Sequence, residues 1–169
     1  MNAVLLAGIV MAVSAGAAAQ VPASSGKVVA VVDGDTIRVL VEGAASEATG
    51  ARPMAVTLRL RGVDCPEKGQ AFGTRARQFT NGLAYRARVS FRVTDRDRNG
   101  RLVADVVLPD GRNLTEEIVR AGFGWWYRRY AAGDARLRAL EDEARKVRRG
   151  LWADASPMAP WDWRAARRR

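Results

Sequence analysis

The chain has 169 residues, with 28 lysines and arginines against 18 aspartates and glutamates, and a formal net charge of +10. Its 48% hydrophobic content is typical of one modest globular domain. The sequence contains no histidine, so Ser-His-Asp triads and other histidine-based acid–base chemistry are excluded. The single cysteine, Cys65, cannot form an intramolecular disulfide or hold a structural zinc ion alone. Any chemistry therefore depends on Asp, Glu, Arg, Lys or a bound metal.

Arginine supplies most of the positive charge, because Lys27, Lys68 and Lys146 are the only lysines. A strongly basic chain favours a polyanionic partner, and nucleic acid is the first candidate. An arginine-rich composition at exposed positions would give the same charge without such a partner. Charge alone leaves both alternatives open, so the motifs have to decide between them.

The first 19 residues have the pattern of a secretory signal peptide. Residues 3–19 contain no charged side chain, and this run is shorter than the ~20 apolar residues that span a bilayer. Three alanines precede Gln20 and form a small-residue cleavage pattern, although the segment lacks the usual amino-terminal Lys or Arg. We predict a signal peptide over 1–19, a linker over 20–26, and a secreted or periplasmic protein with no stable membrane association after cleavage.

Five β-strands are expected in the domain that follows. The predicted strands cover 28–32, 36–41, 56–61, 89–94 and 102–108. An Asp-Gly step joins the first two and an Asn-Gly step joins the last two, and both steps are typical of hairpin turns. A small, polar stretch at 42–53 predicts a surface loop. Alternation in the third strand places Arg59 and Arg61 on one face.

Three α-helices are expected between and after these strands, over 69–84, 114–121 and 134–150. Asn113 is a candidate N-cap for the second helix, and Gly122 is its expected stop. The Trp- and Arg-rich residues 153–169 predict an extended tail. One helix between the third and fourth strands and two after the fifth predict an α+β fold, a five-stranded OB-fold Greek-key barrel over residues 27–152.

Three short runs combine acidic and basic residues at the ends of predicted strands. They are DGDT at 33–36, RLRGVDCPE at 59–67 and DRNGR at 97–101. The set resembles the staphylococcal nuclease (thermonuclease) family, whose members carry DGDT, an R-x-x-x-x-D-[TC]-P-E stretch and a D-x-x-G-R turn in this order. The resemblance covers residues 27–152 and implies the same barrel that the order of elements predicts.

The resemblance implies a calcium site. Asp35 and Asp64 would hold the ion, with the main-chain carbonyl of Cys65 as a further ligand. Calcium prefers hard oxygen ligands of this kind, and water and substrate phosphate would complete the shell. Cys65 occupies a position where threonine is common in the family, and a free thiol there predicts a risk of oxidation.

The resemblance also implies three catalytic side chains. Arg59 and Arg101 would bind the scissile phosphate, because a planar guanidinium matches the geometry of phosphate oxygens. Glu67 would orient or deprotonate the attacking water. Cleavage of a phosphodiester needs a hard cation, help for the water, and donors for the charge that develops on the phosphate, and these residue types supply all three.

We therefore predict an exported, calcium-dependent phosphodiesterase, an endonuclease that hydrolyses DNA and RNA as a monomer. The family resemblance implies 3′-phosphate and 5′-hydroxyl ends. A non-catalytic OB-fold protein that binds nucleic acid is the alternative, and a basic cell-envelope or lipid-binding protein is a third. Neither alternative explains why both acids, both arginines and Glu67 are retained in family order.

Each motif has a simpler interpretation when taken alone. Asp33 and Asp35 could serve only a turn, and Arg101 could be an exposed edge residue. The run from Asp95 to Gly100 also looks like the start of an EF-hand loop. Its twelfth position is Val106 where a bidentate glutamate is required, so an EF-hand is rejected and a hairpin tip that presents Arg101 is expected.

Aromatic and basic residues interleave over 125–130. Trp125, Trp126, Tyr127 and Tyr130 could stack on bases, or a tryptophan among them could belong to the core. The sequence leaves this choice open. The basic residues of the last predicted helix are interpreted as a solvated face, and they are Arg145, Lys146, Arg148 and Arg149.

Overall fold

The computed structural model describes residues 24–41 and 54–168. The predicted signal peptide at 1–19 and the predicted surface loop at 42–53 lie outside these ranges. Within them, no helix is long and apolar enough to cross a membrane.

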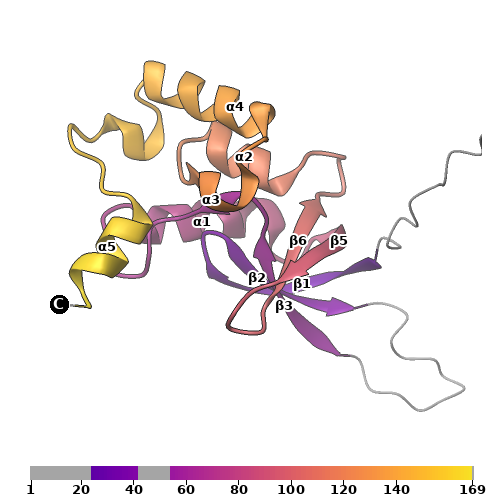
Figure 1. Cartoon of the computed structure of the whole chain (residues 1–169). Helices are drawn as coiled ribbons and strands as arrows, with labels where there is room; N and C mark the ends of the chain where they lie inside the picture. The colour runs from indigo at the N-terminus through magenta and orange to yellow at the C-terminus, as the bar shows by residue number, and fades with distance from the viewer. Residues whose placement is uncertain (1–23, 42–53, 169) are drawn as a thin grey trace, which may run out of the picture.

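Five strands close into a barrel in the order β1-β2-β3-β6-β5 (Figure 1). The strands are β1 (Ser24–Asp33), β2 (Thr36–Val41), β3 (Ala55–Leu60), β5 (Arg88–Arg96) and β6 (Leu102–Val107). Neighbours are antiparallel except β3 and β6, which are parallel. The closed order with one parallel pair confirms the predicted α+β class and the five-stranded OB-type barrel.

The barrel closes through the beginning of β1, which pairs with β5 over Ser24–Lys27 and Arg88–Phe91. The predicted linker over 20–26 is therefore wrong for residues 24–26. Ser24, Ser25 and Gly26 resemble linker residues, but strand pairing uses backbone groups, and pairing with β5 overrides their weak strand propensity.

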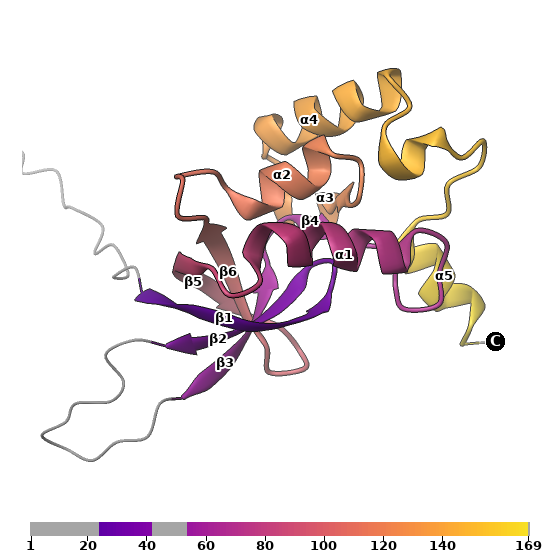
Figure 2. The same cartoon turned by 180° about the vertical axis from the view of Figure 1, so that it is seen from behind.

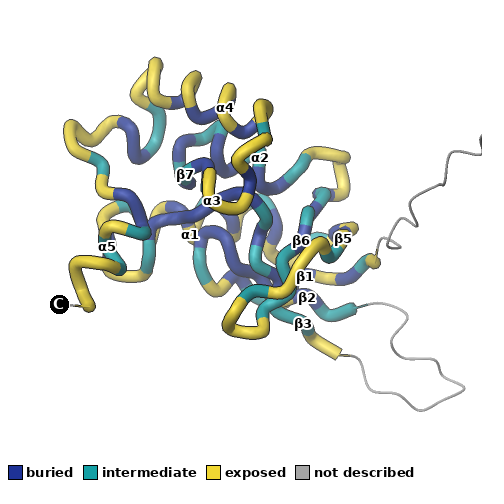
Figure 3. Tube along the Cα trace, viewed as in Figure 1, coloured by how far each residue is buried: buried dark blue, intermediate teal, exposed yellow. Residues whose placement is uncertain are grey.

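The barrel core consists of apolar side chains that alternate along the strands. Its fully buried members include Ile37, Val39, Leu58, Leu60, Val89 and Val106. Helix α1 (Gly73–Ala84) packs on β1, and α2 (Leu114–Arg120) packs against α4 (Ala135–Lys146). Figure 3 shows the amphipathic pattern of α4, with its outward residues exposed and its inward residues buried.

The three predicted helices correspond to α1, α2 and α4. Asn113 caps α2 by accepting the Glu116 N–H (3.2 Å), as predicted, and Asp134 caps α4 by accepting the Leu137 N–H (3.0 Å). Helix α4 ends at Lys146 instead of near residue 150, and a 3₁₀ helix, η1, follows. The additional elements are β4 (Val63–Asp64), β7 (Trp125–Trp126), α3 (Arg128–Ala131) and η1 (Gly150–Ala153).

The predicted extended tail is wrong for its second half, which forms helix α5 (Pro160–Ala166). In both views α5 lies beside the loop that leads into α1 (Figure 1, Figure 2). The side chain of Gln70 joins the two segments, because its Nε2 donates to the carbonyl oxygen of Met158 (2.8 Å). Contacts of this kind between distant segments order a helix that is too short to be stable alone.

Candidate active site

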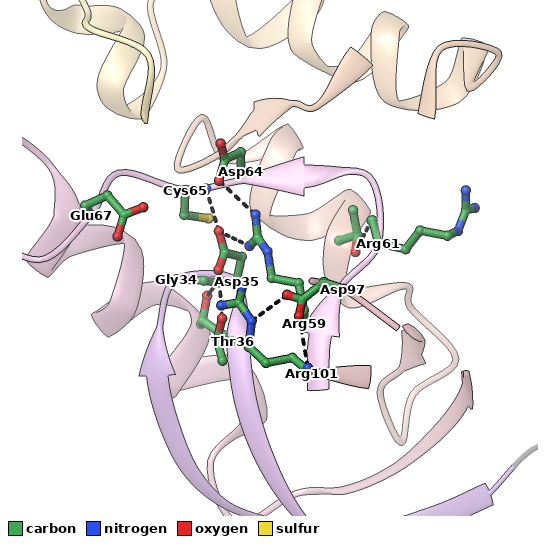
Figure 4. A network of polar contacts seen from close by, with 12 residues as sticks. Gly34, Asp35, Thr36, Arg59, Arg61, Asp64, Cys65, Glu67, Asp97 and Arg101 are labelled. Atoms are coloured by element: carbon green, nitrogen blue, oxygen red, sulfur yellow. Dashed lines mark hydrogen bonds and ion pairs between the residues drawn. The ribbon is translucent and has the colours of Figure 1, made fainter. Parts of the chain in front are cut away.

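A buried cluster of opposite charges lies where β2, β3 and β4 meet at one rim of the barrel (Figure 4). Arg59 near the end of β3 makes ion pairs with two carboxylates, Asp35 beside β2 and Asp64 on β4. Its Nη2 lies 2.8 Å from Oδ1 of Asp64, and its Nη1 contacts Oδ2 of Asp35. The structure thus brings together three of the residues that the sequence assigned to one site.

Strand register and a tight turn bring the side chains of Asp35, Arg59 and Asp64 together. Thr36 pairs with Arg59 across β2 and β3, so Asp35 lies next to the arginine. The Leu60 N–H donates to the carbonyl oxygen of Asp35 (2.9 Å), which extends the pairing past the strand. The turn at Gly62, whose φ is +78°, then reverses the chain so that Asp64 faces the same arginine.

Gly34 permits the close approach of the β1–β2 turn to Cys65. A Cβ at this position would lie 2.7 Å from Cβ of Cys65 and 3.0 Å from Cβ of Ala76, closer than side-chain carbons pack. The DGDT run therefore needs glycine between its aspartates for packing, and not only for the turn.

We expect Gly34→Ala to lower the free energy of unfolding by about 1–3 kcal/mol, because the extra methyl overpacks a rigid contact. Urea unfolding measures this change. The control is Gly82→Ala, in the last turn of α1, where a Cβ meets nothing within 4 Å. The free energy of unfolding of that variant should rise by about 0.5–1 kcal/mol, because alanine has the higher helix propensity. Equal effects of the two substitutions would contradict the packing role of Gly34.

Asp35 is held by two further hydrogen bonds. The backbone N–H of Cys65 donates to its Oδ2 (2.7 Å), and the hydroxyl of Thr36 donates to its Oδ1 (3.0 Å). The Cys65 side chain itself is buried, and burial raises the pKa of its thiol. The structure therefore contradicts the expected oxidation risk, because a buried, protonated thiol is a poor nucleophile.

Sequence reasoning missed one member of the site, Arg164 on α5. Its Nη1 lies 2.6 Å from Oε1 of Glu67 and 3.3 Å from Oδ1 of Asp64, and its Nη2 lies 2.7 Å from Oδ2 of Asp64. Arg164 thus links Glu67 to the cluster. Pro160 at the first helical position and Asp162 in the first turn were helix signals that could have revealed α5, but not the partners of Arg164.

The loop that carries Glu67 is held against the start of α1. The Glu67 N–H donates to Oε1 of Gln70 (3.0 Å), the same residue that bonds Met158. Gly73 permits the contact, because a Cβ there would lie 2.0 Å from the carbonyl oxygen of Glu67. One glutamine side chain therefore holds both the Glu67 loop and the segment that leads to Arg164.

Negative charge exceeds positive charge in this cluster. Four carboxylates face three guanidinium groups. The carboxylates are those of Asp33, Asp35, Asp64 and Glu67, and the guanidinium groups are those of Arg59, Arg101 and Arg164. Burial raises the pKa of Asp64, against the opposing effect of Arg164 and Arg59. Burial and the neighbouring Asp35 also raise the pKa of Asp33. Such a surplus favours a cation.

Two hard oxygen donors fit calcium at this position, namely the carboxylates of Asp35 and Asp64. Among the described residues, no group of three or more Asp, Glu, Cys or His side chains converges as a preformed metal cage. The remaining ligands would therefore have to come from the backbone, water or phosphate, as calcium's flexible shell permits.

Arg101 approaches the cluster from the β5–β6 hairpin. Asp97 holds it in a turn, since the Arg101 N–H donates to Oδ1 (2.9 Å) and its Nε donates to Oδ2 (2.7 Å). Partial burial alone would raise the pKa of Asp97, but the hydrogen bonds outweigh it and lower this pKa. Figure 4 shows the Arg101 guanidinium pointing toward Asp35 and Arg59, while Arg61 points away. The hairpin interpretation of this motif is confirmed.

A cleft of about 620 Å³ opens beside the cluster, and its lining includes Arg59, Glu67, Arg101 and Arg164. Tyr127 and Tyr130 also line it, with their rings 5.0 Å apart. The structure shows which of the aromatic residues over 125–130 belongs to the core and which is exposed, a choice that the sequence left open. Trp126 belongs to the core, because it is 7% exposed and its Nε1 donates to the carbonyl oxygen of Ala131 (2.9 Å), whereas Tyr130 is 63% exposed.

The basic face predicted for the last helix is only partly solvated. Lys146 and Arg148 are exposed, but Arg149 Nη1 donates to the carbonyl oxygen of Arg120 (2.7 Å). The Arg145 guanidinium lies over the Trp152 ring, 3.9 Å from its centroid. Two of the four basic side chains therefore have structural contacts.

OB-type barrels bind oligonucleotides and oligosaccharides, and buried carboxylates and arginines at the rim are groups that can hold a metal ion and a phosphate. A family model described as staphylococcal nuclease homologue matches residues 57–154, and the chain belongs to this family. An uncharacterized endonuclease of Escherichia coli O157:H7 is 40% identical over 139 residues, covering 82% of this chain and 84% of that protein.

Other relatives carry nuclease names. A micrococcal nuclease of Shigella flexneri is 39% identical over 150 residues, which cover 83% of this chain and 80% of that protein. The staphylococcal-like nuclease CAN1 of Arabidopsis thaliana is 34% identical over 111 residues, covering 66% of this chain and 34% of that protein. The predicted family is therefore confirmed. Helix α5 lies beyond the residues that the family model matches.

Proposed function

We propose that this protein is a calcium-dependent endonuclease that hydrolyses DNA and RNA and leaves 3′-phosphate and 5′-hydroxyl ends. The observation that carries the proposal is the Asp35–Arg59–Asp64 cluster beside a cleft that also contains Arg101 and Glu67. Membership of the nuclease family and the endonuclease names of its relatives support it. We also propose export, on the signal-like sequence of residues 1–19, and action as a monomer.

Asp35 and Asp64 would hold calcium, with the carbonyl oxygen of Cys65 as a further candidate ligand. The bound ion would neutralise phosphate charge and polarise its oxygens. Both carboxylates are buried, and hydrogen bonds from Cys65 and Thr36 fix the position of Asp35 before a cation binds.

The chain's own side chains would then orient the substrate. Arg101 presents its terminal nitrogens to the cleft, because Asp97 binds only its Nε and backbone N–H. Arg59 would donate to the phosphate from the buried side. Glu67 has its second carboxylate oxygen available to accept a proton or a hydrogen bond from water, since Arg164 binds Oε1.

The test is cleavage of a single-stranded DNA oligonucleotide, and then of RNA, with calcium and with a chelator. We expect cleavage only with calcium, and products that a polymerase extends only after phosphatase treatment. Asp35→Asn should reduce cleavage at least 100-fold while the protein stays folded, because it removes a charged ligand from a preorganised site.

Asp105→Asn is the matched control, since this β6 carboxylate pairs with Arg61 outside the cluster (2.7 Å). It should cleave at the parent's rate. Equal cleavage by the parent in chelator would contradict the calcium assignment. Binding of the oligonucleotide without any cleavage would instead establish the alternative, a non-catalytic nucleic-acid-binding protein.

A further inference from the structure

Helix α5 brings an additional arginine into the cleft from outside the barrel. Arg164 lines the cleft together with Arg59, Arg101 and Glu67, and its side chain is 33% exposed. The helix lies beyond the residues that the family model matches. The site of this chain therefore contains a charged group that the three motifs of the barrel rim do not supply.

The orientation of the Glu67 carboxylate depends on Arg164. The Glu67 side chain is 36% exposed on the loop before α1, where a long, flexible side chain can adopt many rotamers. Gln70 accepts the Glu67 N–H, which holds the backbone of this loop but not the carboxylate. Within residues 24–41 and 54–168, the only side chain that pairs with this carboxylate is Arg164, whose Nη1 lies 2.6 Å from Oε1. The direction of the second oxygen, Oε2, is therefore set by the arginine of α5.

The same guanidinium also binds Asp64. Nη2 of Arg164 lies 2.7 Å from Oδ2 of Asp64, and Nη1 lies 3.3 Å from Oδ1. The Asp64 side chain is buried and is held on its other side by Nη2 of Arg59 (2.8 Å). A guanidinium is planar and its donors have a fixed geometry, so Arg164 places Glu67 at a defined position relative to Asp64. Each carboxylate oxygen has two lone pairs, so Asp64 can accept these hydrogen bonds and still bind a cation.

Helix α5 is anchored by contacts that do not involve Arg164. The Trp161 ring is parallel to that of Tyr127 (5°), with centroids 5.6 Å apart, and meets Trp125 edge-on at 5.5 Å. The segment before the helix is held by the hydrogen bond from Gln70 to the carbonyl oxygen of Met158 (2.8 Å). Trp161 lies one turn before Arg164. These anchors therefore hold the start of α5 in place when the Arg164 side chain is replaced.

We propose that Arg164 is a positioning residue, whose guanidinium bridges Asp64 and Glu67 and so holds Glu67 where it orients the attacking water. The proposal rests on the proposed function, in which Asp64 is a ligand of the ion beside the phosphate. The bridge then fixes the water-orienting group relative to the phosphate. Displacement of such a group by about 1 Å can lower the rate about 100-fold. Arg164 acts through Glu67 and does not itself have to touch the substrate.

The experiment is a double-mutant cycle, read by single-turnover cleavage of a single-stranded DNA oligonucleotide at saturating calcium. Rates over a range of enzyme concentrations give the rate constant at saturation and the concentration at half saturation. Arg164→Ala should lower the rate constant about 10- to 100-fold and leave the half-saturating concentration within about threefold of the parent's. In a Glu67→Ala background, Arg164→Ala should lower the rate constant by less than about twofold, because the group that it positions is gone.

Arg164→Lys tests the geometry of the bridge. Lysine keeps a positive charge on α5 but has no planar fork to bridge two carboxylates, so its rate constant should stay at least about fivefold below the parent's. Near-UV circular dichroism, which reports the packing of the Trp161 and Tyr127 rings, should match the parent in the lysine variant and shows whether α5 stays docked. Arg167→Ala is the matched control, since this guanidinium lies over the Trp163 ring and does not line the cleft. It should cleave at the parent's rate.

Calorimetric titration with calcium gives a readout without cleavage, and Arg164→Ala should bind the ion no more weakly than the parent. Weaker binding would overturn the positioning role, because lost metal would then explain lost cleavage. If Arg164→Ala lowers the rate equally with and without Glu67, or if Arg164→Lys cleaves at the parent's rate, the positioning role is wrong and the nuclease assignment stands. A parent protein that does not cleave with calcium overturns the proposed function, and the positioning role with it.

Discussion

Arg101→Lys is expected to lower kcat about 100-fold or more, the scale of losing one preorganised donor to a developing charge. Lysine keeps the positive charge but cannot form the two-pronged contact of a guanidinium with phosphate oxygens. Asp97 binds Nε of Arg101 and so directs the terminal nitrogens into the cleft. Since these nitrogens would be used most fully in the transition state, the loss should appear in kcat.

Single-turnover cleavage of a short oligonucleotide at saturating calcium measures this effect, and denaturant unfolding checks stability. Arg112→Lys is the control, because Arg112 also pairs with a turn aspartate, Asp110 (2.6 Å), but lies outside the cleft. Its cleavage should match the parent. If Arg101→Lys cleaves within about threefold of the parent and remains equally stable, the guanidinium is not used in the transition state.

The barrel and the rim cluster could be predicted because their signals are local. Alternation over 56–61 predicted β3, and the Asp-Gly step predicted the β1–β2 turn, so Asp35 and Arg59 had to lie near each other once the strands paired. The cap at Asn113 was equally local. Each of these elements depends on residues within a few positions of one another.

The tail and the aromatic residues could not be predicted, because tertiary contacts determine them. A seven-residue helix such as α5 forms only where distant residues hold it, here Gln70, Asp64 and Tyr127. Trp125 and Trp126 are adjacent in the sequence, yet only Trp126 is in the core, because their strand β7 points them to opposite sides. The ion pairs of Arg164 likewise span about a hundred residues.

Arg164 has an electrostatic consequence for calcium. It binds both Oδ atoms of Asp64 and Oε1 of Glu67, and Asp64 is a proposed ligand of the ion. A cation that binds Asp64 must displace these charge-assisted hydrogen bonds or accept a neighbouring positive charge. Either effect lowers the affinity for calcium.

We therefore expect Arg164→Ala to bind calcium about tenfold more tightly or better, because each hydrogen bond to a charged group contributes about 1.5–3 kcal/mol. Isothermal titration calorimetry without substrate measures the dissociation constant directly. Arg167→Ala, at the C-cap of α5, removes the same charge, but the Arg167 guanidinium lies over the Trp163 ring instead of against a carboxylate. It should change the affinity by less than threefold, since an exposed charge is screened by solvent. If Arg164→Ala and Arg167→Ala bind calcium equally well, Arg164 does not compete with the ion for the carboxylates of Asp64 and Glu67.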